Sequence, residues 1–127
     1  MRTAGKMKRK ETGILGEKLA RAYLEQHSYT IVETNYRSPS GEIDIVARQG
    51  DYLVFIEVRA KRSHGYGSPE ESVTALKKEH LIDSTAHYYQ THENLPALYR
   101  IDFVAVEIGR DNTPHRISLI ENAVTES

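Results

Sequence analysis

The spacing of apolar residues along the chain predicts two helices and a set of strands. Between residues 12 and 27, apolar side chains recur three and four positions apart, which is typical of a helix with one buried face. A second helix is expected from Ser68 to about Gln90, because Ser68 and Glu71 form a capping box with Pro69 at the first helical position. Strands are expected at residues 30–35, 43–48, 52–60, 100–108 and 115–120.

The order of these elements is typical of a mixed sheet flanked by helices. A chain of 127 residues also has the length of one ordinary domain. We therefore expect a single α/β domain over residues 12–127, preceded by a flexible basic tail over residues 1–11. Five of the first ten residues are basic, and such an arm either contacts a polyanion or is simply solvated.

The amino-acid composition excludes several classes of protein. Hydrophobic residues make up 39% and charged residues 28% of the chain, as in soluble globular proteins. The chain has no cysteine, which excludes disulfide scaffolds, thiolate zinc sites and cysteine nucleophiles. It has no apolar run long enough to span a membrane, so we expect a cytoplasmic protein with no membrane partner. The net charge is −1, yet residues 1–62 hold 12 basic and 8 acidic residues, whereas residues 63–127 hold 5 and 10.

The two β-rich segments around residues 50–51 predict a hairpin with acidic residues on it. A two-residue or four-residue loop places Asp44 opposite Glu57, whereas a three-residue loop puts them on opposite faces. Strict alternation predicts two rows along the first strand. One row holds Glu42, Asp44 and Val46, and the other holds Ile43, Ile45 and Ala47.

Two carboxylates that face each other across strands repel, and something must offset that cost. A hard divalent cation such as Mg²⁺ does so, since it is commonly held by one or two carboxylates together with substrate phosphate. The alternative is that Arg59 and Lys61 neutralise an exposed acidic pair formed by Asp44 and Glu57.

The runs Gly-Glu-Ile-Asp-Ile-Val-Ala at residues 41–47 and Leu-Val-Phe-Ile-Glu-Val-Arg at residues 53–59 resemble the YraN family. These bacterial proteins are placed by sequence in the PD-(D/E)xK superfamily, near the archaeal Holliday-junction resolvases. The resemblance also covers residues 16–20, 67–77 and 100–104, and so extends from about residue 13 to residue 108. The implied fold is a restriction-endonuclease-like mixed central sheet flanked by helices.

The resemblance implies a metal-dependent endonuclease that acts on DNA, with branched or structured DNA as the substrate. Asp44 and Glu57 look like the metal ligands of the superfamily, for Mg²⁺ or Mn²⁺. Glu17 resembles the additional helical glutamate of resolvase-like members, and its alternative is an exposed pair with Arg21. Because resolvases of this kind act as twofold dimers, the resemblance also implies a homodimer.

The chain departs from the superfamily pattern at the catalytic lysine, where it has Arg59. Arginine stays protonated and cannot act as a base, although its planar fork can hold a phosphate. Lys61, on the same strand face, is the candidate substitute. The candidate nucleic-acid contacts are Arg59, Lys61, Arg62 and Lys77, of which Lys77 is alternatively a solvated residue. Two other functions remain open, a DNA-binding module that does not cut and a protein–protein adaptor that uses the acidic half.

Overall fold

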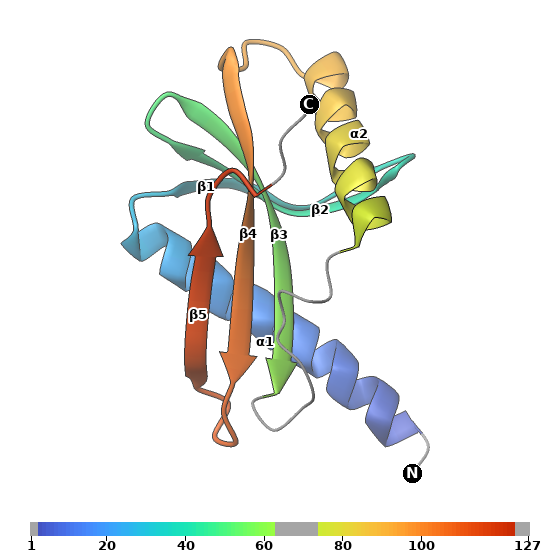
Figure 1. Cartoon of the computed structure of the whole chain (residues 1–127), viewed down its shortest axis with the longest axis vertical. Helices are drawn as coiled ribbons and strands as arrows, with labels where there is room; N and C mark the ends of the chain where they lie inside the picture. The colour runs from blue at the N-terminus through green and yellow to red at the C-terminus, as the bar shows by residue number, and fades with distance from the viewer. Residues whose placement is uncertain (1–2, 63–73, 124–127) are drawn as a thin grey trace.

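Five strands form one mixed sheet with a helix on each face in the computed structural model (Figure 1). The structure describes residues 3–62 and 74–123, with side chains from residue 10 onward. The strands are β1 (Thr30–Ser38), β2 (Gly41–Gln49), β3 (Tyr52–Arg62), β4 (Leu98–Ile108) and β5 (Pro114–Ile120). The helices are α1 (Thr3–Gln26) and α2 (Ala75–Thr91). This arrangement is consistent with the expected restriction-endonuclease-like α/β fold.

The strands lie side by side in the order of the chain. Neighbouring strands are antiparallel except β3 and β4, which are parallel because the connection between them crosses over through α2. β3 is therefore the central strand, and its apolar residues are buried on both faces of the sheet. Val54 and Ile56 belong to the cluster beneath α1, whereas Leu53 and Phe55 belong to the cluster beneath α2.

Helix α1 begins earlier than the apolar pattern predicts. Residues 3–11, expected as a flexible tail, are the first turns of α1, and this part of the helix extends beyond the sheet (Figure 1). Residues 3–10 include alanine, lysine, methionine and arginine, which favour helix without needing a buried face. The periodicity therefore marked the buried part of the helix and not its start. In the part of the chain that the structure describes, no helix is both long and apolar enough to cross a membrane.

Helix α2 also begins at a different residue from the one predicted. The expected start at Ser68 lies outside the described residues, and the helix described begins at Ala75. Thr74 is its N-cap, with an extended backbone, and the Thr74 hydroxyl accepts a hydrogen bond from the Lys77 N–H at 3.1 Å. An extended residue interrupts a helix, so a continuous helix from Ser68 is wrong. Thr74, and not Ser68, caps the helix that packs on the sheet.

Candidate active site

The hairpin of β2 and β3 has the predicted two-residue loop, in which Gly50 adopts a positive φ of 57°. Residues 45–49 pair with residues 52–56, and the antiparallel ladder between the two strands covers these residues. β3 continues along β4 as far as Arg62, while β2 turns away from it. We call the place where β2 leaves β3 the fork. Asp44 and Glu57 are the next residues on the two strands, and both therefore stand at the fork.

β2 does not keep strict alternation at the fork. Ile43 packs in the cluster beneath α2 together with Val46, whereas Ile45 and Ala47 pack beneath α1. The predicted face of Ile43 is therefore wrong. The reason is that β2 leaves β3 and runs with β1 beneath α2 (Figure 1), so the face it presents to each helix changes along its length.

Asp44 supplies the hydrogen-bond acceptor that β3 loses at the fork. The Val58 N–H donates to Asp44 Oδ2 at 2.8 Å, in place of a backbone carbonyl of a continuing strand. Burial, and next the negative charge of Glu57, raise the pKa of Asp44 to about 7. We call Asp44 and Glu57 the acidic pair.

Glu57 is almost completely buried, and its two oxygens have different surroundings. Glu57 Oε2 is 2.9 Å from Arg59 Nη2 and 3.3 Å from Lys77 Nζ. Glu57 Oε1 is buried and meets no hydrogen-bond donor in the described part of the chain. Arg59 Nε is a buried donor that likewise lacks an acceptor there. An unsatisfied buried polar group costs about 1–3 kcal/mol, so the surroundings of Glu57 Oε1 and Arg59 Nε are unfavourable for stability.

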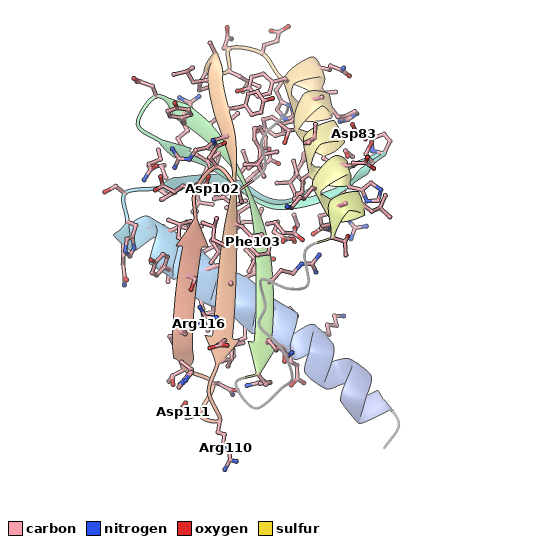
Figure 2. The ribbon with its side chains drawn as sticks, in the orientation of Figure 1. Asp83, Asp102, Phe103, Arg110, Asp111 and Arg116 are labelled. Carbon is pink, nitrogen blue, oxygen red and sulfur yellow. The ribbon has the colours of Figure 1, made fainter. Side chains whose placement is uncertain are left out.

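A second buried carboxylate shows what a purely structural one looks like. Asp102, in the middle of β4 (Figure 2), is fully buried, as Glu57 nearly is. Its oxygens accept hydrogen bonds from the Tyr29 hydroxyl at 2.8 Å, Arg100 Nε at 3.0 Å and the Asn122 N–H at 2.9 Å. Both of its oxygens are therefore satisfied by the protein, as is usual for a buried charge. Glu57 departs from this rule.

A pocket of about 490 Å³ opens on the α1 side of the fork, and its carboxylates are Glu17, Glu42 and Asp44. The Asn35 amide donates to Glu17 Oε1 at 3.1 Å. Burial, and next the charge of Asp44, raise the pKa of Glu17, while the Asn35 hydrogen bond and the charge of Arg21 lower it. Within the described residues, no three acidic or histidine side chains converge closely enough to form a complete metal site. Glu17 thus shares a pocket with Asp44 without completing a three-carboxylate cluster.

The predicted basic residues separate into two groups. Arg59 and Lys77 contact the acidic pair directly, and Lys77 is therefore held by an ion pair rather than only by solvent. Lys61 lies two residues beyond Arg59 along β3 and is half-buried. Arg62 Nη1 donates to Asn112 Oδ1 at 2.5 Å, in the turn between β4 and β5. Arg62 is therefore directed toward that turn.

Two residues that the sequence analysis passed over hold Glu17 in place. A Cβ atom on Gly16 would lie 2.3 Å from Ala60 Cβ, so only glycine lets α1 approach β3 this closely. Asn35 has a left-handed backbone with φ of 55° and donates to Glu17. An asparagine inside a β-rich segment was the available signal, because asparagine is depleted in strands and enriched at positive φ.

Comparisons with known proteins cover the whole site. Residues 16–106 match the model of a family described as "Uncharacterised protein family UPF0102". A UPF0102 protein from Dehalococcoides mccartyi is 54% identical over 120 residues, which cover 93% of this chain and 96% of that protein. A UPF0102 protein from Syntrophus aciditrophicus is 44% identical over 112 residues, or 88% and 87% of the two chains. One from Moorella thermoacetica is 41% identical over 117 residues, or 92% and 98%.

Proposed function

Because the chain belongs to the uncharacterised protein family UPF0102, whose description names no reaction, we propose its function from the fork itself: metal-dependent hydrolysis of phosphodiester bonds in DNA. This family is the one that the resemblance indicated under the name YraN. The observation that carries the proposal is the buried acidic pair, in which Glu57 Oε1 has no donor among the described residues. The resemblance to the PD-(D/E)xK superfamily supports the choice of DNA as substrate.

The acidic pair fits a hard divalent cation such as Mg²⁺ or Mn²⁺. The Val58 N–H fixes Asp44 through Oδ2, which leaves Oδ1 for a cation, and Glu57 Oε1 is the second oxygen available. Two protein carboxylates suffice for Mg²⁺, because waters and substrate phosphate commonly complete its coordination. Glu17, which lines the same pocket as Asp44, is the proposed further ligand. When bound, such a cation polarises the phosphate and lowers the pKa of a bound water.

Arg59 is the proposed phosphate clamp of the site. Its guanidinium contacts Glu57 Oε2, and about one-third of the side chain is exposed, so it can reach a phosphate at the surface. A planar guanidinium donates two parallel hydrogen bonds to phosphate oxygens and stabilises the charge that develops on them. Lys61, further along β3, is the proposed contact for a neighbouring phosphate of the same DNA strand.

The alternative function is a DNA-binding module of the same fold without turnover. The observation that favours it is Arg59 itself, which occupies the position of the superfamily lysine and cannot take up a proton at neutral pH. The basic side chains of the fork would then grip DNA without cutting it. An adaptor that binds a basic protein through its acidic half is the third function to be tested.

Cleavage of branched DNA by the purified protein tests the proposal. We expect cleavage in Mg²⁺ or Mn²⁺, none with a chelator, and a loss of about 100-fold or more in Glu57→Gln, which weakens the cation site. Glu79→Gln is the matched control, because Glu79 is an exposed glutamate of α2. Binding without cleavage would replace the nuclease by the binding module, and neither binding nor cleavage would favour the adaptor. Sedimentation of the same sample checks the implied homodimer.

A further inference from the structure

Lys77 reaches the acidic pair from a different element than the other residues of the fork. It lies in the first turn of α2, and its Nζ is 3.3 Å from Glu57 Oε2. The Thr74 hydroxyl caps the Lys77 N–H, which fixes the backbone of that turn. The adjacent Lys78 is exposed, so the helix places one of two consecutive lysines at the site and the other in solvent.

Glu57 carries one negative charge and receives two cations. Arg59 and Lys77 both contact the same oxygen, Glu57 Oε2, and a single carboxylate does not require both for neutralisation. The two cations on one oxygen are two adjacent donors of different shape, an arrangement that fits a phosphate beside Glu57.

Lys77 is better placed than Lys61 for work at the acidic pair. Along an extended strand, Lys61 stands about 7 Å beyond Arg59, and it pairs with Glu107 in the ladder between β3 and β4. Lys77 instead contacts Glu57 directly. An ammonium group is a compact point charge with three donors, whereas a guanidinium is a planar fork. The two groups at Glu57 are therefore suited to different tasks.

We propose that Lys77 is the catalytic ammonium of the fork and performs from α2 the role that the resemblance assigns to a lysine at position 59. This inference rests on the proposed function. In the hydrolysis, a water oxygen bonds to phosphorus while the bond from phosphorus to the leaving oxygen breaks. The water gives a proton to solvent, and the leaving oxygen takes one from solvent. Lys77 stays protonated throughout, orients the water and donates to the charged phosphate oxygens, while Arg59 clamps the phosphate.

Single-turnover cleavage of branched DNA in Mg²⁺ tests this role. We expect Lys77→Met to lower the rate by about 100-fold, the effect of removing one preorganised donor to a developing charge. Lys78→Met is the matched control and should cut within about twofold of the parent. Adding Arg59→Lys to Lys77→Met should recover at least about tenfold, because it returns an ammonium to the same carboxylate. A lysine that only stabilised the fold would not be replaced by a residue on β3.

Calorimetric titration with Mn²⁺ alone separates this inference from the proposed function. Lys77→Met should bind Mn²⁺ at least as tightly as the parent, because it removes a cation that competes for Glu57. If Lys77→Met cuts like the parent, is not rescued by Arg59→Lys, or loses Mn²⁺ binding, the inference fails while the nuclease stands. If the parent cuts no faster than Glu57→Gln, the nuclease fails and the inference fails with it.

Discussion

At the scale of single residues, Asp44 is subject to two opposing demands. As an anion it accepts the Val58 N–H strongly, but it then repels the buried charge of Glu57. As a neutral acid it avoids that repulsion. Burial, which disfavours the charged form, is the largest cause of its raised pKa and tilts the balance toward the neutral acid. Without a cation, the ionised fork is therefore a local source of instability.

The free energy of unfolding should depend on pH because Asp44 is buried beside Glu57. The folded-state pKa of Asp44 is about 7 and its ordinary value is 3.8, so between these values the folded protein binds the extra proton. The free energy of unfolding should therefore rise as the pH falls from 8 to 5, with a slope of at most about 1.4 kcal/mol per pH unit. Urea denaturation without divalent cations measures it. Asp44→Asn should flatten the slope, and an unchanged slope would assign the effect to another group.

The acidic pair is predictable from the sequence because the hairpin loop determines its register. Once Gly50 and Asp51 form a two-residue loop, Asp44 and Glu57 must come together at the end of the ladder. The same reasoning failed for Ile43, because the departure of β2 from β3 depends on how β1 and α2 pack. It also could not place Lys77 at Glu57, since that contact depends on a crossover between distant parts of the chain.

At the scale of elements, the position of α1 depends on its contact with β3. Gly16 faces Ala60, and the space for a side chain at that point is absent. Gly13, one turn earlier on the same helix, has no atom within 4 Å of the place where a Cβ would stand. These two glycines therefore offer a matched comparison of a packed and an unpacked position.

Gly16→Ala should destabilise the protein by about 1–3 kcal/mol, because the added methyl group forces α1 away from β3. Gly13→Ala should stabilise it by about 0.5–1 kcal/mol through helix propensity alone. Thermal unfolding of both variants gives the comparison, and Ala60→Gly should recover part of the loss in Gly16→Ala. Equal effects of the two substitutions would contradict close packing at Gly16.

The starts of both helices show that an apolar pattern reports the buried part of a helix and not its full length. Burial produces periodicity, so the pattern found the part of α1 that covers the sheet and missed its first nine residues. For α2, Ser68 and Thr74 are both residues that favour an N-cap, and tertiary packing rather than local preference determines where the described helix begins. The strands were predicted more closely, because buried β-branched segments and turn residues limit them on both sides.

At the scale of the whole molecule, the division of charge follows the fold. The basic half of the sequence forms α1 and strands β1 to β3, which include most of the fork. The acidic half includes α2, β4 and β5, and from it Lys77 contributes to the site. Arg110 and Asp111 stand at the tip of the turn between β4 and β5, at the end of the molecule opposite α2 (Figure 2).

The salt dependence of DNA binding should locate the binding face. Each phosphate contact contributes about −0.9 to the slope of log affinity against log salt. Lys10→Gln and Arg59→Gln should each make the slope shallower by about that amount, since both residues border the fork. Arg110→Gln is the control, because its exposed side chain lies at the tip of the β4–β5 turn (Figure 2). If only Arg110→Gln changed the slope, the DNA-binding face would lie at the β4–β5 turn and not at the fork.

The close contact of Gly16 with Ala60 also holds α1 against β3 near the middle of the helix. From Gly16 back to Thr3 the helix is about 20 Å long, and this arm extends past the sheet (Figure 1). Because Ala20 and Leu24 hold the second half of α1 in the core, only the part before Gly16 is free to bend, and a bend of about 10° there would move the start of α1 through about 3 Å. Glu17, which follows the tightly packed Gly16, would barely move. If DNA binds as proposed, the basic arm can follow its contour while the carboxylates at the fork keep their positions.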